Sequence, residues 1–181
     1  VKEGRWEVTA STWVEADKNM PNGESMARHL LYAKTYLSRL FDIPIDDLYL
    51  DFEPDTFGHS VNVPEILNRG GVKHYYHCRG YSSKYPNYHL YRWVAPSGAS
   101  VLVYCEPFCY LGEIDPSIAY YVPEFCRKCG LDTMPRVFGV GDHGGGPTRR
   151  DVERILDMNT WPIFPQIRFG TLREFFARAE S

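Results

Sequence analysis

Hydrophobic residues recur every three or four positions between residues 24 and 41, with polar residues between them. This spacing places the hydrophobic side chains on one face of an α-helix. The repeating positions are Met26, Leu30, Ala33, Leu37 and Leu40. We therefore expect an amphipathic helix over residues 24–41 that packs this face against the rest of the fold.

Shorter apolar runs elsewhere in the chain predict strands. The run at residues 5–13 alternates bulky and polar side chains, as a half-buried strand does. Further strands are expected at residues 48–52, 73–79, 88–94, 100–105, 135–140 and 163–169. The runs at 88–94 and 100–105 are joined directly by the turn sequence Ala-Pro-Ser-Gly at 95–98, which predicts a hairpin.

Helices are expected between most of these strands, at residues 64–68, 122–130, 148–158 and 171–179. The last of them begins with Thr171 and has Glu174 three residues later, which is the pattern of a capping box. Strands that alternate with helices predict the α/β class, with a parallel sheet or barrel. No internal boundary stands out, so we expect residues 1–181 to form a single segment of one domain.

Composition and charge exclude several classes of protein. With 44% hydrophobic and 15% aromatic residues, the chain can bury a substantial core. A net charge of −3 gives no basic face, so neither nucleic acid nor an anionic membrane is an expected partner. No apolar run approaches the ~20 residues of a membrane span. Because the first residue is not Met and strand-like sequence begins at once, we expect a piece of a longer protein.

The five cysteines are an odd number for a disulfide framework, which favours reduced thiols and a cytoplasmic location. The spacing of Cys105, Cys109, Cys126 and Cys129 also has to be considered as a zinc site. However, the second pair lies in an expected helix closed by Gly130, without the turns that structural zinc sites use. Buried free thiols are therefore the favoured interpretation.

Asp55 is the first candidate for catalysis. It follows the expected strand at 48–52, where Pro54 ends regular pairing and Gly58 permits a sharp turn. A carboxylate on a loop between a strand and the following helix is placed where α/β barrels keep their catalytic residues. The alternative is an aspartate that only caps the turn.

A second carboxylate, Asp142, lies in the glycine-rich stretch at residues 141–147, between an expected strand and an expected helix. This stretch lacks the Lys and Ser/Thr of a phosphate-binding loop, so nucleotide binding is disfavoured. Three consecutive glycines allow the backbone to approach a ligand closely, or they serve a tight loop that needs positive φ angles.

Two strand-end carboxylates facing one pocket are what glycoside hydrolysis requires, one as nucleophile and one as proton donor. Several aromatic residues near these loops would suit packing against a sugar face, although most of them are expected in the core. They are Trp13, Phe57, Tyr75, Tyr76, Tyr81, Phe108 and Tyr110.

Four blocks of the sequence resemble, in order and spacing, the family 38 α-mannosidases. They are residues 4–7 (Gly-Arg-Trp-Glu), 13–25 (with Trp-Val-Glu-Ala-Asp, then Asn19, Pro21 and Gly-Glu-Ser), 54–60 (Pro-Asp-Thr-Phe-Gly-His-Ser) and 141–148 (Gly-Asp-His-Gly-Gly-Gly-Pro-Thr). The resemblance extends over nearly the whole chain. It implies part of a distorted (β/α)7 barrel with mostly parallel strands, cut from the centre of a larger catalytic domain.

The resemblance also implies roles for individual residues. Asp55 matches the catalytic nucleophile, which in this family also ligates zinc, and Asp142 matches the general acid/base. Arg79 matches an active-site arginine at the end of the next strand. The remaining candidates are for substrate binding (His143, Phe57 and Tyr110) and, as second choices for acid/base, Glu113 and Asp115.

By this resemblance the parent protein is a retaining α-mannosidase that acts on mannose-containing oligosaccharides with the help of zinc. The family's zinc site uses a His-x-Asp pair and a later histidine, but none of the six histidines here is followed by Asp at plus two. Asp55 alone cannot hold zinc, which takes about four ligands. We therefore expect an incomplete zinc site, little activity in the isolated chain, and self-association through open barrel edges.

Two other interpretations remain open from the sequence. One is a metal-dependent barrel hydrolase similar to the polysaccharide deacetylases, which the absence of a His-x-x-x-His pair makes less favoured. The other is a non-catalytic carbohydrate-binding or packing domain whose loops have lost their chemistry. Replacing Asp55 by Asn in the full-length protein separates a hydrolase from a binding domain.

Overall fold

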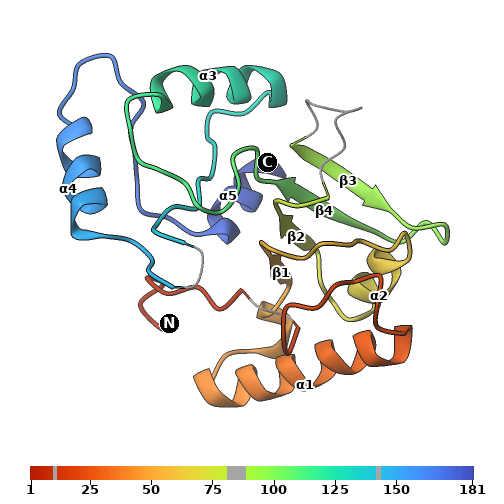
Figure 1. Cartoon of the computed structure of the whole chain (residues 1–181). Helices are drawn as coiled ribbons and strands as arrows, with labels where there is room; N and C mark the ends of the chain where they lie inside the picture. Colours follow the sequence, from red (N-terminus) through yellow and green to blue (C-terminus); the bar gives the residue numbers. More distant parts are fainter. Residues whose placement is uncertain (10–11, 81–88, 142–143) are drawn as a thin grey trace. The chain divides into compact units, whose positions relative to one another are not determined.

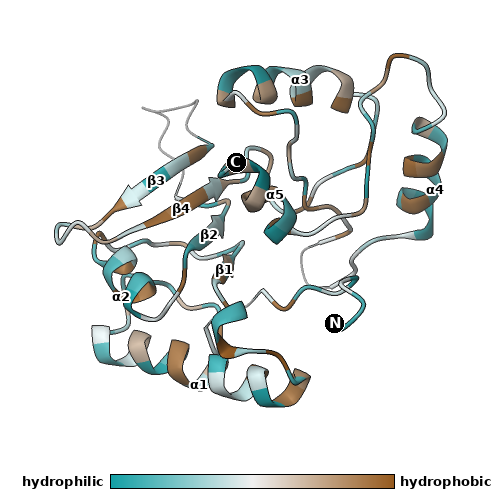
Figure 2. Ribbon diagram, turned by 180° about the vertical axis from the view of Figure 1, so that it is seen from behind, coloured by the Kyte–Doolittle hydropathy of each residue, from teal (hydrophilic) through white to brown (hydrophobic). Residues whose placement is uncertain are grey.

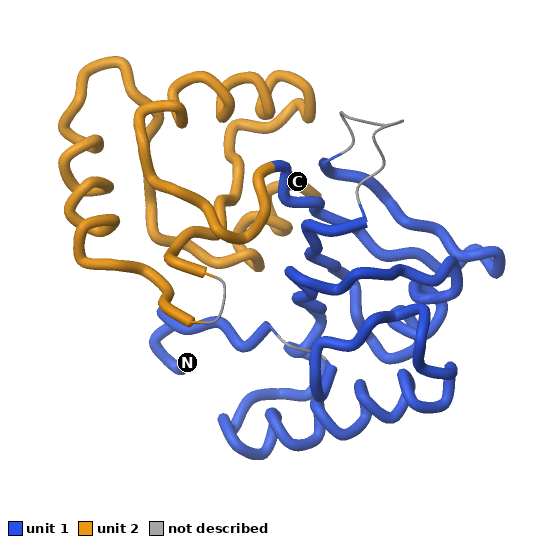
Figure 3. The backbone as a smooth tube through the Cα atoms, viewed as in Figure 1, with its two compact units in different colours: residues 1–107 blue, residues 108–181 orange. Residues whose placement is uncertain are grey.

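A four-stranded sheet is the centre of the N-terminal part of the chain (Figure 1). The computed structural model describes residues 1–9, 12–80, 89–141 and 144–181. These residues divide into two units, residues 1–107 and residues 108–181 (Figure 3). None of the described helices has the length and apolarity that crossing a membrane requires.

The sheet has the strand order β1-β2-β4-β3 and is mostly parallel. Its strands are β1 (Leu50–Glu53), β2 (His74–His77), β3 (Leu90–Val94) and β4 (Ser100–Cys105). β2 pairs in parallel with both β1 and β4, whereas β3 pairs antiparallel with β4. The predicted α/β class with mostly parallel strands is confirmed, and so is the hairpin. Among the described residues the sheet is open, with β1 and β3 at its edges.

The predicted amphipathic helix is α1 (Gly23–Phe41). Its first turn is capped by Asn22, whose side chain accepts a hydrogen bond of 2.8 Å from the backbone N–H of Ser25. Figure 2 shows hydrophobic and hydrophilic residues alternating along this helix. Leu40, which we expected in the buried face, is 56% exposed. A short 3-10 helix (Ile45–Asp47) then leads into β1.

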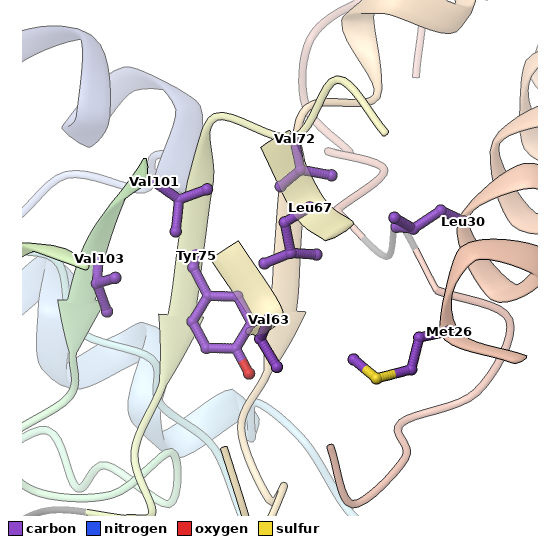
Figure 4. Packing of buried hydrophobic residues seen from close by; sticks show 8 residues of the cluster. All are labelled: Met26, Leu30, Val63, Leu67, Val72, Tyr75, Val101 and Val103. Atoms are coloured by element: carbon purple, nitrogen blue, oxygen red, sulfur yellow. The ribbon is translucent and has the colours of Figure 1, made fainter. Parts of the chain in front are cut away.

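The core of the N-terminal unit lies between the sheet, α1 and α2 (Val63–Arg69). Figure 4 shows two side chains from α1 and two from α2 packed toward residues of β2 and β4. The buried members of this cluster are Met26, Leu30, Val63, Leu67, Val72, Tyr75, Val101 and Val103. Burial of this apolar surface is the main force that holds the two helices on the sheet.

Strand register divides one face of the sheet into an apolar part and a polar part. Tyr75 of β2 is paired with Val103 of β4, and both belong to the core cluster. Two residues further along β2, His77 is paired with Glu53 of β1. Because residues two apart in a strand point to the same face, the core gives way to polar groups at the carboxyl ends of the strands.

Three helices lie in the described residues of the C-terminal unit, and two of them share a smaller core. They are α3 (Ile118–Cys129), α4 (Arg149–Met158) and α5 (Leu172–Ala179). Thr148 and Thr171 begin α4 and α5 with capping boxes, so the predicted box of Thr171 and Glu174 is confirmed. The buried cluster joins α3 and α4 through Ile114, Ile118, Ile155 and Met158.

Two of the expected strands in the C-terminal unit are wrong. Residues 135–140 make isolated bridges, Gly112 with Phe138 and Val140 with Gly146, and residues 163–169 are irregular. Pro165 interrupts the second run and cannot donate to a strand partner. A short apolar run in the sequence does not show whether a neighbouring strand is present to pair with it.

The strand expected at residues 5–13 is also wrong for the residues that the structure describes. Residues 5–9 and 12–13 form bends and irregular backbone, and positions 10 and 11 lie outside the description. Trp6 packs edge-on against Phe41, with ring centroids 5.6 Å apart, and Trp13 packs against Tyr36 at 5.4 Å. The bulky residues of this run therefore contact α1 instead of pairing in the sheet.

Replacing Leu67 by Ala is expected to destabilise the chain by about 2–5 kcal/mol, because the side chain is 1% exposed and its loss leaves a cavity between α2 and the sheet. Leu31→Ala is the matched control, since Leu31 is 58% exposed on α1. Urea unfolding followed by circular dichroism measures both. Equal, small shifts in the two variants would contradict the packing described for the core.

Candidate active site

The loop that carries Asp55 is interlocked with residues 12–20, which precede α1. The backbone N–H of Lys18 donates to the carbonyl of Gly58 at 3.0 Å, and Thr56 Oγ1 donates to the carbonyl of Ala16 at 3.3 Å. The backbone N–H of Asp55 donates to the carboxylate of Glu15. Three hydrogen bonds thus hold the catalytic candidate's loop from one neighbouring segment.

Gly58 is required by this close approach. A Cβ atom at this position would lie 2.3 Å from Asn19 Nδ2 and 2.5 Å from Asp17 Oδ1. Such distances are far inside van der Waals contact, so any other residue would push the two segments apart. The glycine that we expected to permit a sharp turn therefore also makes room for residues 17–19.

Beneath the loop lies a buried ionic cluster formed by Lys18, Asp51 and Glu53, each at most 2% exposed. Lys18 Nζ is 2.7 Å from Glu53 Oε1 and 3.1 Å from Asp51 Oδ2. Two hydroxyl groups complete the surroundings of Glu53, since Thr12 Oγ1 donates to Oε1 at 2.8 Å and Thr56 Oγ1 lies 2.9 Å from Oε2. Buried charges are stable only when paired and hydrogen-bonded in this way.

The cluster contains one cation and two acids, which shifts their pKa values. Burial raises the pKa of Glu53 to about 8, and the charge of Asp51 adds to this against the opposing effect of Lys18. Burial alone would lower the pKa of Lys18, but the two carboxyl groups outweigh it and raise the pKa. With a proton on Glu53 the cluster is neutral, which suits its buried position.

Above this cluster, Asp55 forms an ion pair with Arg79 Nε, two residues past the end of β2. Both side chains remain accessible, with exposed fractions of 36% for Asp55 and 41% for Arg79. The Arg79 guanidinium also lies 4.8 Å from the centre of the Phe57 ring. The structure therefore brings together three residues singled out from the sequence, at the carboxyl ends of adjacent strands.

Two histidines approach the backbone of Arg79. His59 Nε2 lies 3.1 Å and His77 Nδ1 lies 2.6 Å from its carbonyl oxygen. Reasoning from the sequence missed both histidines, as well as Lys18 and Glu53. The sequence did contain a signal for a buried polar cluster. Asp51 and Glu53 lie two positions apart in an otherwise apolar run and therefore on one face of the strand, and acids on a buried face must have partners.

Asp142 and His143 lie outside the described residues. On either side of them, Val140 and Gly146 exchange backbone hydrogen bonds of 2.9 and 2.6 Å. Gly144, Gly145 and Gly146 all have positive φ, between 108° and 131°. A Cβ on Gly145 would also lie 2.3 Å from the carbonyl oxygen of Val140. The glycines therefore serve the tight loop that the sequence left as one of two explanations.

The remaining candidates lie in the C-terminal unit, on the segment before α3. Tyr110 is partly buried and Glu113 is exposed. Asp115 Oδ1 accepts a hydrogen bond of 2.7 Å from the backbone N–H of Ser117. Hydrogen bonds from the side chain and backbone of Ser117 lower the pKa of Asp115, which suits a turn-forming carboxylate better than a proton donor at neutral pH.

Comparison with known proteins decides the family. The model of the glycosyl hydrolases family 38 N-terminal domain matches residues 1–181. The chain belongs to this family. The resemblance recognised in the sequence is therefore confirmed over its full length.

The relatives of this family 38 chain include several α-mannosidases. It is 29% identical to alpha-mannosidase G of Dictyostelium discoideum over 99% of its own length, and 27% identical to alpha-mannosidase 2C1 of Homo sapiens over 98%. In each case it spans 17% of the longer relative. The crystal structure of an alpha-mannosidase from Enterococcus faecalis V583 matches 94% of this chain and 20% of that one, with a TM-score of 0.67 and 20% identity, and so shares the fold.

The described part of this family 38 chain does not contain a metal site of its own. No group of three or more His, Cys, Asp or Glu side chains among the described residues is arranged to hold a metal ion. Asp55 faces Arg79, a cation, and zinc takes about four ligands. All five cysteines, each within the described residues, are free thiols. The zinc site that the resemblance implies therefore stays a prediction.

The raised pKa of Glu53 predicts that the stability of the family 38 chain depends on pH. Glu53 keeps its proton in the folded state up to about pH 8 but loses it near pH 4.5 when unfolded. Its contribution is thus complete below pH 4.5 and is lost as the pH rises through 8. Between pH 7 and 8 we expect Glu53 to lower the free energy of unfolding by about 1 kcal/mol relative to a variant that cannot titrate at this position.

Glu53→Gln is the matched control, because it replaces the protonated acid with a neutral group of the same shape. The difference in the free energy of unfolding between the wild type and this variant, measured by urea unfolding at steps of pH, isolates the effect of Glu53 because all other titrating groups are shared. His59 and His77, whose pKa values are lowered first by burial, act in the opposite direction while the unfolded histidines titrate near pH 6.5, but their effect is the same in both proteins. Parallel curves for the two proteins would contradict a proton on Glu53.

Proposed function

We propose that this chain is the central part of the catalytic domain of a longer, retaining α-mannosidase that hydrolyses mannose-containing oligosaccharides. One observation carries the proposal. In a chain of family 38, Asp55 lies just past the end of a strand, and its accessible carboxylate is paired with Arg79. The backbone N–H of Asp55 donates to the carboxylate of Glu15, which holds the residue in place. In this proposal the four described strands are part of a distorted (β/α)7 barrel, and the rest of the barrel comes from the longer protein.

In the proposed reaction, a carboxylate oxygen of Asp55 attacks the anomeric carbon as the bond to the leaving oxygen breaks. A covalent mannosyl ester forms, and a second carboxyl group gives its proton to the leaving oxygen. That group then takes a proton from water, which attacks the same carbon and releases mannose with its configuration retained. The guanidinium of Arg79 balances the charge of the Asp55 carboxylate and orients it before the attack.

We assign the second carboxyl group to Asp142, which would have to lie about 5–5.5 Å from Asp55. Among the alternatives, Glu113 remains open, while the hydrogen bonds of Asp115 favour a structural role. Phe57 lies beside Arg79 and is 68% exposed, so its ring is available to pack against a sugar face. Tyr110 and His143 are further candidates for substrate binding.

Zinc remains part of the proposal for the longer protein. Asp55 would contribute one ligand, and the others would come from residues outside the described ones. Bound zinc would orient sugar hydroxyl groups and stabilise charge. From the free cysteines we also propose a cytoplasmic location. The open edges at β1 and β3 would lead the isolated chain to self-associate and to show little activity.

Asp55→Asn in the full-length protein is expected to lower kcat for an aryl α-mannoside by about 10³-fold or more, because the amide cannot form the ester. Asp46→Asn is the control, since Asp46 is exposed on the short helix before β1. Nearly unchanged turnover in Asp55→Asn would remove this residue from the chemistry.

Trapping gives a more direct measurement. A fluorinated mannosyl fluoride slows the second step, so the ester should accumulate on the nucleophile and be found by mass spectrometry on the peptide that contains Asp55. An adduct on another carboxylate would reassign the nucleophile. A wild-type protein that binds mannosides without hydrolysing them would support the carbohydrate-binding alternative instead.

A further inference from the structure

We propose that His59 and His77 are positioning residues that clamp the backbone carbonyl of Arg79 and so hold its guanidinium against Asp55. The inference rests on the proposed function for its catalytic consequence, but the clamp itself is a property of the described residues. It would add two histidines and two tyrosines to the machinery of the site, none of which touches the reacting atoms.

The hydrogen-bond donors of the clamp follow from the acceptor. A carbonyl oxygen can only accept, so both nitrogens that face it must carry protons. These nitrogens are His59 Nε2, at 3.1 Å, and His77 Nδ1, at 2.6 Å. The two imidazoles therefore use opposite ring nitrogens as donors to one oxygen.

The other ring nitrogen of each histidine faces a tyrosine hydroxyl. His59 Nδ1 lies 3.0 Å from Tyr75 Oη, and His77 Nε2 lies 2.9 Å from Tyr91 Oη. In neutral imidazole this second nitrogen is an acceptor, so each tyrosine donates to its histidine. Burial lowers the pKa of both histidines, in keeping with neutral rings. Two Tyr–His chains thus converge on the carbonyl of Arg79.

The supports of the clamp are rigid elements. Tyr75 is fully buried in β2, and Tyr91 belongs to β3. Trp93 packs edge-on against both Tyr75 and His59, with centroid separations of 5.6 and 6.1 Å. Gly80 follows Arg79 with φ +80°, and a Cβ there would lie 2.6 Å from His59 Cδ2. The backbone therefore needs glycine at this point for His59 to reach the carbonyl.

Such a clamp matters because the ion pair it supports is accessible. An exposed Arg–carboxylate pair gains little from its charges alone and loses side-chain entropy when it forms. Fixing the arginine backbone reduces that loss and holds the guanidinium in one place before substrate binds. The alternative is that the two histidines only stabilise the end of β2, and the experiment must separate these roles.

Substitutions matched to the ring nitrogens separate them. The amide nitrogen of Gln occupies roughly the place of His Nε2, and that of Asn the place of Nδ1. His59→Gln and His77→Asn therefore keep the donor to Arg79, whereas His59→Asn and His77→Gln misplace it. In the full-length protein we expect the misplaced pair to lower kcat/KM for an aryl α-mannoside about tenfold or more, and the matched pair to stay close to wild type.

A background without the guanidinium shows whether the effect passes through Arg79. In Arg79→Met, the misplaced variants should cause little further loss, because the group that they position is gone. Losses that add fully to that of Arg79→Met, or equal losses in matched and misplaced variants, would overturn the positioning role.

The tautomers can be observed without any activity. Long-range ¹H–¹⁵N spectra of the 181-residue chain at pH 7 should show His59 protonated at Nε2 and His77 protonated at Nδ1. The opposite tautomer at either position would overturn the clamp, because it leaves no proton on the nitrogen that faces the carbonyl. If the full-length protein proves inactive on mannosides, the proposed function fails while these spectra still decide the clamp.

Discussion

The burial of Asp51 and Glu53 in β1 is the constraint on which the candidate site depends. Two carboxyl groups on one face of a buried strand require a cation and hydrogen-bond donors. Lys18, Thr12 and Thr56 supply them, so residues 12–20 must lie across the end of β1. Breaking a buried ion pair by removing one partner typically costs about 3–5 kcal/mol, which makes this arrangement strongly preferred.

The loop of Asp55 takes its position from this constraint. Once residues 12–20 are held by the ionic cluster, their backbone and Glu15 meet the loop at Asp55, Thr56 and Gly58. The parallel register of β1 and β2 then brings Arg79 alongside Asp55, because adjacent parallel strands end at the same edge of the sheet. The buried ionic cluster, the loop of Asp55 and the pairing of β1 with β2 together place the accessible carboxylate of Asp55 beside Arg79.

Much of the fold was predictable from local patterns. The period of the apolar residues predicted α1, the turn sequence predicted the β3–β4 hairpin, and a capping box predicted the start of α5. The strands expected at residues 135–140 and 163–169 were wrong, because an apolar run in the sequence does not show whether a pairing partner exists. The expected burial of Leu40 was also wrong, because the period of the apolar residues does not show which turns of the helix are covered by other elements.

The positions of Asp55 and Arg79 in the candidate site were predictable from the order of strands and loops in the sequence. The side chains that surround these two residues were not. Asp55 and Arg79 each follow a strand, and parallel pairing brings such positions together. The roles of Lys18, His59 and His77 require knowing which side chains face one another across strands and loops, and no local pattern contains that information. The convergence of Asp142 with Asp55 stays a prediction, because Asp142 lies outside the described residues.

The cluster of Lys18, Asp51 and Glu53 also has a consequence for the order in which the chain folds. The lysine precedes α1 and the acids follow it, so the chain must reverse its direction between residues 18 and 51 for these groups to meet. Contacts between residues so far apart in sequence carry a loop-closure cost, which places them late among folding events. We therefore expect α1, whose contacts are local, to form before the contacts that hold the candidate site.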